Sequence, residues 1–199
     1  MSQVLDELVS LLSMEPIEED LFRGASQDLG FRQMFGGQVL GQSLSAASQT
    51  VGDGRLVHSL HGYFLRPGDA GLPVVYQVER VRDGGSFSTR RVTAIQKGKT
   101  IFTCAASFQG IEEGFHHQAQ MPEVPGPETL RSETVLARLV ADKLPERLRE
   151  RAVHDKPIDI RPVSLNNPFD PKPADPVKHV WFRADGALPD NPALHQYLL

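Results

Sequence analysis

The sequence predicts an α+β fold in which one long, buried helix is wrapped by a curved antiparallel sheet. Residues 35–47 (FGGQVLGQSLSAA) have an apolar helical face but carry no charged side chain, whereas a surface helix normally has a charged outer face. Four strand-like segments follow between residues 55 and 109 and are separated by short turns. Because short turns favour antiparallel neighbours, these segments predict a sheet that encloses the neutral helix.

The segments before this helix are predicted to form a short helix and one strand. Apolar residues recur at helical spacing within residues 2–13, and Pro16 ends that pattern. Residues 17–24 (IEEDLFRG) are predicted to form a strand, and the polar residues 25–33 connect it to the central helix. The Gly-Asp-Gly run at residues 52–54 is a helix stop signal, so the central helix is expected to end before it.

Four long strands are predicted after the central helix. Turn sequences rich in Gly separate them at residues 67–68, 83–85 and 97–99. We expect a meander, in which each strand pairs with the next. A meander that curves around one long helix is a hotdog fold, and its predicted strands are residues 55–66, 72–82, 86–96 and 100–109.

Part of this arrangement recurs near the C-terminus. The run LFR at residues 21–23 is matched by WFR at residues 181–183, and each run is followed by a polar connection and a helix containing a glutamine. These glutamines are Gln38 and Gln196. The order strand, connection, helix predicts an internal repeat whose second copy stops at Leu199, within its helix. We therefore expect a longer double-domain protein or a chain that a partner completes.

The repeat divides the chain into three predicted parts. Residues 1–112 form an N-terminal hotdog domain, and residues 157–199 begin a second, incomplete hotdog domain. Residues 113–156 lie between them as a linker with helices, because three prolines between residues 122 and 127 are typical of a linker and residues 133–144 have a helical pattern.

Composition limits the classes of function. The chain has 199 residues, 40% of them hydrophobic, and a net charge of −4, so neither nucleic acid nor an anionic membrane surface is an expected partner. Its one cysteine, Cys104, excludes an intrachain disulfide and is expected to be a small buried hydrophobe. Residues 4–12 are too short and too charged for a membrane span and lack the basic start of a signal peptide. We expect a cytoplasmic location and no membrane insertion.

Three stretches of the sequence carry a family resemblance in combination. They are LFRGASQDLGFRQMFGGQVLGQSLSAA at residues 21–47, VHSLHGYFLRPGD at residues 57–69 and RDGGSFSTRRVTAIQKGKTIFTCAASFQ at residues 82–109. Together they resemble the acyl-CoA thioesterase II family of double-hotdog enzymes. The resemblance implies hydrolysis of fatty acyl-CoA thioesters to free fatty acid and CoA, with water as nucleophile. It implies no metal and no cofactor, since CoA is part of the substrate.

The resemblance also implies where the catalytic groups lie. The family uses an Asp, a Thr and a Gln of the second hotdog, and its Asp follows a run similar to HQYLL at residues 195–199. We therefore expect these groups after Leu199. The corresponding position of the first hotdog lies near Ala46, which is not an acid, so this domain is expected to be a structural partner. Residues 1–199 alone are expected to hydrolyse palmitoyl-CoA negligibly.

The start of the central helix is a candidate substrate-binding site. Backbone N–H groups at a helix N-terminus have no partner within the helix and can hold a thioester carbonyl. Gly36 and Gly37 allow such a group to approach closely, and Gln38 follows in the first turn. The alternative interpretation is that the glycines only permit tight packing of the helix.

His58 is the candidate catalytic residue within the chain. Alternation along the predicted strand places it on one side with Leu56, Leu60 and Phe64, so it is expected to point inward. There it could act as a base or orient the thioester. The alternative interpretation is a hydrogen-bonded core histidine.

Several arginines lie at predicted strand ends and turns. Arginine suits bidentate contacts with phosphate, and CoA carries several phosphates; ordinary salt bridges are the alternative. Ser86 and Phe87 are expected to border the substrate slot, with a core strand position as the alternative for Phe87. The sequence shows no spacing of ligands for a metal site. The arginines are Arg66, Arg82, Arg90 and Arg91, and Arg66 and Arg90 are the candidate substrate contacts.

Three functions are compatible with these patterns. The first is an acyl-CoA thioesterase. The second is a hotdog hydratase or dehydratase acting on acyl-CoA, which needs an acid that the first central helix lacks. The third is a non-catalytic acyl-CoA-binding or assembly fragment. Because hotdog sheets commonly pair with one another, homo-oligomers are expected in each case.

Overall fold

The computed structural model describes residues 2–30, 32–165, 170 and 172–199. Contacts divide the chain into two units. One unit holds residues 7–114 together with residues 188–199, and the other holds residues 1–6 and 115–187. The double-hotdog organisation and the bounds of its three predicted parts stay a prediction.

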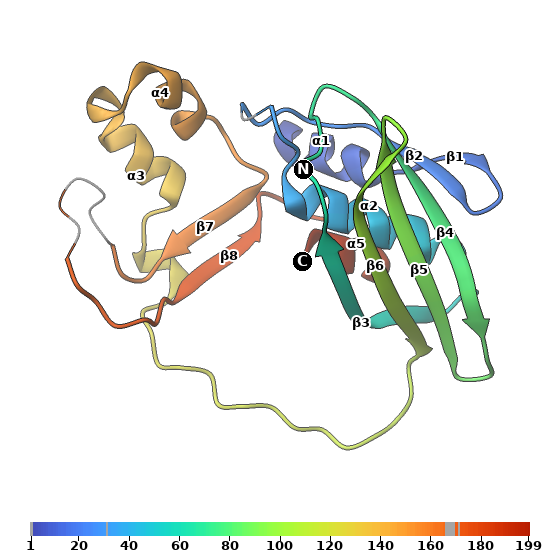
Figure 1. Ribbon diagram of the computed structural model, residues 1–199. Helices are drawn as coiled ribbons and strands as arrows, with labels where there is room; N and C mark the ends of the chain where they lie inside the picture. Colours follow the sequence, from blue (N-terminus) through green and yellow to red (C-terminus); the bar gives the residue numbers. More distant parts are fainter. Residues whose placement is uncertain (1, 31, 166–169, 171) are drawn as a thin grey trace. The chain divides into compact units, whose positions relative to one another are not determined.

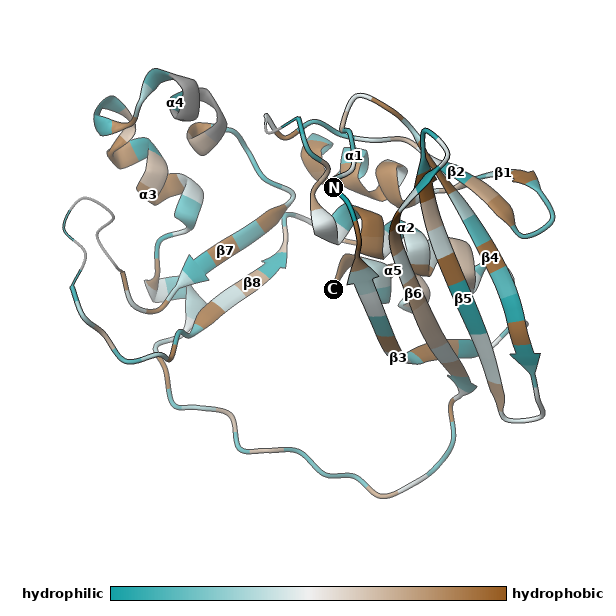
Figure 2. Ribbon diagram, in the orientation of Figure 1, coloured by the Kyte–Doolittle hydropathy of each residue, from teal (hydrophilic) through white to brown (hydrophobic). Residues whose placement is uncertain are grey.

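The first unit is built on a six-stranded antiparallel sheet (Figure 1). Side chains alternate between buried and less buried along β5 and along the first half of β4. Figure 2 shows hydrophobic and hydrophilic residues mixed along both strands. One face of this sheet therefore packs on the core. In spatial order the strands are β1 (Glu15–Glu18), β2 (Leu21–Gly24), β4 (Val74–Asp83), β5 (Phe87–Gln96), β6 (Lys99–Gly110) and β3 (Arg55–Phe64).

Two predictions about the sheet are wrong. Residues 17–24 are not one strand, because the chain turns at Asp20, whose φ is 59°, and β1 pairs back on β2. The meander is also broken, since β3 pairs with β6 at the edge of the sheet and not with β4. The connection at residues 65–73 is too long to force a hairpin, whereas the short turns before β5 and β6 do join neighbouring strands.

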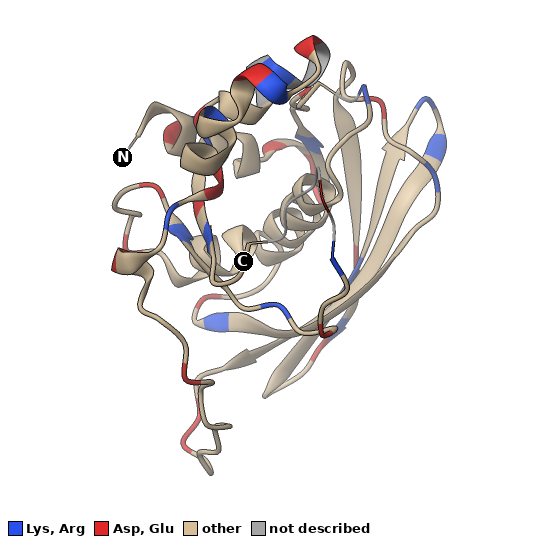
Figure 3. Cartoon of the chain, turned by 90° about the vertical axis from the view of Figure 1, so that its left-hand side faces the viewer, with Lys and Arg blue, Asp and Glu red and all other residues tan. Residues whose placement is uncertain are grey.

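Helix α2 (Gly36–Ser48) is the buried central helix that the sequence predicts. It packs on β5 and also contacts β3, β4 and β6. In Figure 3 no Lys, Arg, Asp or Glu colours this helix. Its buried Leu44, Ala46 and Ala47 join a core with Tyr76 and Phe108 of the sheet. Small neutral side chains on every face explain how the sheet can enclose the helix closely.

A buried amide fastens α2 to its surroundings. Gln42 has no exposed surface, and its Nε2 donates to Leu11 O at 2.7 Å and to Ala25 O at 2.8 Å. Its Oε1 accepts from the hydroxyl of Tyr76 at 2.7 Å. Leu11 belongs to α1 (Gln3–Leu12), so one side chain joins the first helix, the connection after β2 and the sheet. Each of these polar atoms has a partner, as a low-dielectric core requires.

Helix α5 (Pro192–Leu198) packs on α2 and β3 within the same unit. A Cβ built on Gly41 would lie 3.0 Å from the carbonyl oxygen of Tyr197, so glycine permits the close approach of the two helices. The side chain of Gln196 then pairs with the edge of the sheet. Its Oε1 accepts from Val57 N at 3.2 Å and its Nε2 donates to Val57 O at 2.8 Å. The Gln196 amide thus makes the two hydrogen bonds with the Val57 backbone that a residue of a neighbouring strand would make.

The second unit combines helices with a two-stranded antiparallel sheet. The predicted helix at residues 133–144 is shorter, because Val140 leaves helical geometry and a 3₁₀ turn follows. Trp181 donates its indole N–H to Pro125 O at 3.0 Å, which ties the proline-rich segment to this sheet. The elements are η1 (Pro127–Thr129), α3 (Glu133–Leu139), η2 (Ala141–Lys143), α4 (Glu146–Val153), β7 (Ile158–Pro162) and β8 (Val180–Ala184).

Candidate functional site

A pocket of about 430 Å³ lies at the start of α2, within the first unit. Four segments form it: the end of the connection before α2, the first turns of α2, the turn after β3 and the start of β6. Most of its wall is apolar, so it suits an alkyl group. The lining residues are Gln33, Met34, Gly36, Val39, Phe64, Leu65, Arg66, Pro67, Gly68, Ile101 and Phe102.

Two aromatic rings form part of the wall. Phe102 is buried, and the centroid of its ring lies 4.8 Å from that of Phe64, which is 60% exposed. A Cβ on Gly36 would lie 3.1 Å from the ring of Phe64, which is tighter than normal van der Waals contact. Glycine at position 36 therefore lets the ring lie directly against the start of α2, and the pocket stays open to solvent beside it.

The rim of the pocket is held by backbone contacts between two segments. Met34 N donates to Gly68 O at 2.9 Å, and Ala70 N donates to Arg32 O at 3.1 Å. Gln33 and Asp69 form an isolated antiparallel bridge between the same segments. The connection before α2 and the turn after β3 thus form a short ladder that fixes the pocket wall.

The helix end at the pocket favours electron-rich groups. Phe35 is the N-cap residue of α2, no side chain caps the helix, and its first turn contains no acidic residue. The positive end of the helix dipole is therefore not neutralised by a carboxylate of its own first turn. Arg66 lies exposed at the rim, with one N–H donating to Thr100 O at 2.7 Å.

The carboxylate of Asp69, beside the rim, accepts two hydrogen bonds. A hydrogen bond from Gly71 N–H and a second one from Lys97 lower its pKa below the ordinary value. The Lys97 Nζ lies 3.1 Å from the carboxylate. Asp69 is thus an ionised acceptor that stabilises a turn, and its lowered pKa makes it a poor general base.

The structure brings only some of the predicted site residues together. Gly36 and Arg66 both line the pocket. A Cβ on Gly37 would lie 2.5 Å from the ring of Phe35, so this glycine serves packing at the helix start. Gln38 is buried and donates to Ala25 O at 3.0 Å, so its side chain holds the connection after β2 against the start of α2.

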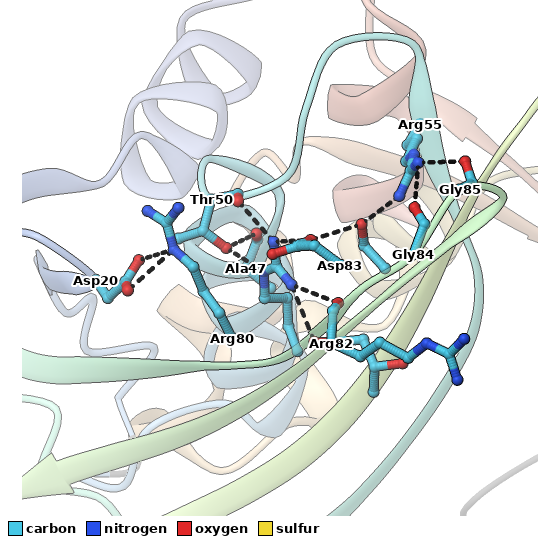
Figure 4. Close-up of polar contacts among 12 residues, drawn as sticks. Asp20, Ala47, Thr50, Arg55, Arg80, Arg82, Asp83, Gly84 and Gly85 are labelled. Atoms are coloured by element: carbon cyan, nitrogen blue, oxygen red, sulfur yellow. Dashed lines mark hydrogen bonds and ion pairs between the residues drawn. The ribbon is translucent and has the colours of Figure 1, made fainter.

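Arg90 lies apart from the pocket, at the C-terminal end of α2. Its side chain is 1% exposed, and all five N–H groups of its guanidinium have partners. Figure 4 shows the surrounding network, which includes Thr50, Arg82 and Asp83. The acceptors are Thr50 Oγ1 at 2.7 Å, Thr50 O at 2.8 Å, Arg82 O at 3.1 Å, Thr89 O at 3.0 Å and Asp83 Oδ1 at 2.6 Å.

This network makes Arg90 a structural tie and not a phosphate contact. It joins Thr50, in the turn that follows α2, to the hairpin between β4 and β5. The hairpin is held further by Arg55, which donates to Ser88 Oγ at 2.6 Å and to the carbonyl oxygens of Gly84 and Gly85. The arginines predicted as one cluster therefore do not form one site. Arg91, for example, is paired with Glu79 on the exposed face.

His58 does not point inward, contrary to the prediction. Ser59, and not His58, is paired with Ser107, so His58 is the extra residue of a β-bulge and the alternation from Leu56 is interrupted. The imidazole is exposed, lies 2.9 Å from Ser107 Oγ and contacts the ring of Phe87 edge-on. His58 and Phe87 thus share the solvent face of the sheet, and Ser86 is exposed in the turn before β5.

Among the residues that the structure describes, neither a reactive thiol nor a metal cluster is found near the pocket. Cys104 is a free, buried thiol, as predicted, and burial raises its pKa to about 11. Within residues 2–30, 32–165, 170 and 172–199 no group of three or more His, Cys, Asp or Glu side chains could hold a metal ion.

Sequence reasoning missed most of the pocket wall. Met34, Phe64, Gly68 and Phe102 line the pocket, but in the sequence they look like ordinary core or turn residues. The signal that was available is the proline-containing connection at residues 65–73, which is longer than a hairpin turn. Such a connection has to cross other elements, and here it crosses the start of α2.

The part of the chain that forms this pocket matches a known family. A family model described as the acyl-CoA thioesterase N-terminal domain matches residues 26–109, which include α2, the pocket and all four long strands. Acyl-CoA thioesterase 2 of Haemophilus influenzae is 46% identical over 199 residues, which is 100% of this chain and 70% of that protein. The chain belongs to the acyl-CoA thioesterase II family.

Other members of the family agree with this assignment. Human acyl-coenzyme A thioesterase 8 is 43% identical over 188 residues, covering 91% of this chain and 59% of that protein. The crystal structure of acyl-CoA thioesterase II TesB2 from Mycobacterium marinum superposes with a TM-score of 0.71 at 39% identity, covering 96% of this chain and 65% of that one. The chain thus spans less than two thirds of the length of these two thioesterases.

A more distant structure confirms the fold. A hot dog protein of unknown function from Alicyclobacillus acidocaldarius superposes with a TM-score of 0.73 at 21% identity, covering 96% of this chain and 67% of that one. The predicted α+β hotdog fold is therefore correct for this member of the thioesterase II family. No helix in the described part of the chain is long and apolar enough to span a membrane.

Proposed function

We propose that this protein hydrolyses fatty acyl-CoA thioesters to a free fatty acid and CoA. The observation that carries the proposal is the 46% identity, over the whole chain, to a protein named acyl-CoA thioesterase 2. In the reaction, water attacks the thioester carbonyl carbon, the carbon–sulfur bond breaks, and CoA leaves as a thiolate that takes up a proton. The Asp, Thr and Gln implied by the resemblance stay a prediction, and we assign no general base to the described residues.

The pocket supports a substrate-binding role for this part of the protein. Its apolar wall accepts the alkyl chain, and burial of each methylene contributes about 0.8 kcal/mol. The uncapped start of α2 presents N–H groups to an electron-rich oxygen. Arg66 at the rim is available to a phosphate of CoA. These three features match the acyl chain, the thioester and the nucleotide of one ligand class.

Self-association is proposed from the edge of the sheet. β3 is one of the two outermost strands, and among the described residues it pairs only with β6, apart from the Gln196 contact at Val57. An unpaired strand edge is a template for pairing with another sheet. We propose that hotdog sheets pair there to give homo-oligomers, which analytical ultracentrifugation tests.

Replacing Arg66 with alanine is expected to raise KM for decanoyl-CoA about tenfold and leave kcat nearly unchanged, because a charge-assisted phosphate contact contributes to binding alone. The increase should shrink at high salt. Steady-state hydrolysis, followed by thiol release, measures both constants, and Arg23→Ala is the control, since Arg23 is an exposed arginine paired with Glu15. Equal KM values for Arg66→Ala and the wild type would remove Arg66 from the CoA site. These assays use a protein that includes the predicted second hotdog domain in full. No thioester hydrolysis by the wild type of that protein would contradict the proposed function itself.

A further inference from the structure

Gln96 lies directly behind the pocket, at the end of β5. It is 7% exposed and is not part of the lining. Its Oε1 accepts from Asp69 N at 2.8 Å, and its Nε2 lies 3.0 Å from Asp69 O and 2.9 Å from Leu72 O. Its Nε2 also lies 3.4 Å from Pro73 O. One side-chain amide therefore contacts the backbone of the connection between β3 and β4 at three residues.

The residues held by Gln96 are next to the pocket wall. Asp69 follows Gly68, whose carbonyl oxygen accepts from Met34 N at 2.9 Å, and both Gly68 and Met34 line the pocket. Gln96 Nε2 also lies 3.6 Å from Met34 Sδ. The amide thus contacts both sides of the short ladder that forms the rim.

A second polar group meets the amide at the same carbonyl. Ser26 Oγ donates to Leu72 O at 2.5 Å and lies 3.5 Å from Met34 Sδ. Ser26 comes from the connection after β2, so three segments meet behind the pocket. The exposed ion pair between Lys97 and Asp69 adds little to this, because solvent screens exposed pairs. The buried amide is the group whose loss leaves backbone donors and acceptors without partners.

We propose that Gln96 is a positioning residue for acyl-CoA binding in the pocket. Its amide fixes residues 66–72 against the connection before α2, and so sets the width of the pocket that receives the ligand. The proposal rests on the proposed function, since it names a residue that shapes the same site. Gln96 does not touch the reacting atoms, so its effect falls on substrate affinity and not on the chemical step.

The test replaces Gln96 with methionine, which keeps the length of the side chain but removes its hydrogen bonds to the backbone. We expect Kd for S-decyl-CoA, a thioether that cannot be hydrolysed, and KM for decanoyl-CoA to rise about tenfold, while kcat changes less than about twofold. Backbone amides of residues 66–72 should exchange hydrogen faster than in the wild type. Gln77→Met, on an exposed position of β4, is the matched control. If Gln96→Met does not unfold cooperatively, the same measurements are made on Gln96→Asn, which keeps the amide but has a side chain too short to reach the same backbone groups.

The outcomes separate this proposal from the function on which it rests. Weaker S-decyl-CoA binding with nearly unchanged kcat, confined to the Gln96 variants, supports the positioning role. Wild-type affinity in a folded Gln96→Met protein overturns it while leaving the proposed function intact, as does a loss of kcat at unchanged affinity. If the wild-type full-length protein neither binds S-decyl-CoA nor hydrolyses decanoyl-CoA, the proposed function fails and the role of Gln96 fails with it.

Discussion

Replacing Arg90 with methionine is expected to lower the free energy of unfolding by about 3 kcal/mol, because it removes the only side chain that donates to three backbone carbonyl oxygens around the buried guanidinium. The guanidinium is 1% exposed and has five acceptors. Methionine fills part of the volume but donates no hydrogen bond to Thr50 O or Arg82 O. The loss should detach the turn that follows α2 from the hairpin between β4 and β5.

Urea unfolding followed by circular dichroism measures this effect, and the neighbouring Arg91→Met is the control. Arg91 pairs with Glu79 at the surface, where both side chains are more than half exposed, so its loss should cost at most about 1 kcal/mol. Equal costs for the two substitutions would contradict the structural role of Arg90.

The same network predicts a pH dependence. Hydrogen bonds from Arg90 and Ser88 hold the pKa of Asp83 below its ordinary value. A lowered folded-state pKa adds stability that is present above the unfolded-state pKa and is lost as pH falls through the folded-state pKa. The difference in stability between wild type and Arg90→Met should therefore narrow in acid, below about pH 4.

Replacing Gln42 with methionine is expected to lower the free energy of unfolding by about 2–3 kcal/mol, because it leaves the buried Tyr76 hydroxyl without its acceptor and Leu11 O without its donor. Burial raises the pKa of Tyr76, so this hydroxyl stays protonated and needs an acceptor. Tyr76→Phe alone should lower the free energy of unfolding by about 1 kcal/mol.

A double-mutant cycle isolates the contact between these two side chains. Because Tyr76→Phe removes the hydroxyl that Gln42→Met leaves unpaired, the double substitution should cost less than the sum of the single ones by about 1 kcal/mol. Urea unfolding of the four proteins gives this coupling energy. If the losses in free energy of unfolding of the two single variants add up to that of the double variant, Gln42 stabilises the helix without the contact to Tyr76.

The main elements of this fold could be predicted from sequence for physical reasons. The helix at residues 35–47 has no charged side chain, and only enclosure by other elements suits such a helix. The strands were delimited by glycine-containing turns, because glycine adopts the positive φ of tight turns without steric cost, as Gly98 does. The partner of β3 could not be predicted in this way, because alternation shows which face is buried but not which strand lies beside it.

The candidate site could be predicted only where it is formed by backbone N–H groups, at the start of α2. The open start of α2 follows from Gly36 and the lack of a capping side chain, and the pocket lies there. Arg66 and Arg90 look alike in the sequence, but one lies at the pocket rim and the other is buried among acceptors. Their difference depends on Thr50 and Asp83, which only the folded chain brings together. His58 was misplaced because a bulge interrupts the alternation of β3.

The central claim, that the pocket at the start of α2 receives the acyl chain of acyl-CoA, can be tested by NMR of the four methionine methyl groups. Met34 lines the pocket, whereas Met14 lies in the packed core. Titration of methyl-labelled protein with S-decyl-CoA is expected to shift the Met34 signal in a saturable manner and to leave Met14 unchanged, and CoA without an acyl chain should have a much smaller effect on Met34. Saturable binding of S-decyl-CoA with an unmoved Met34 signal would contradict the claim.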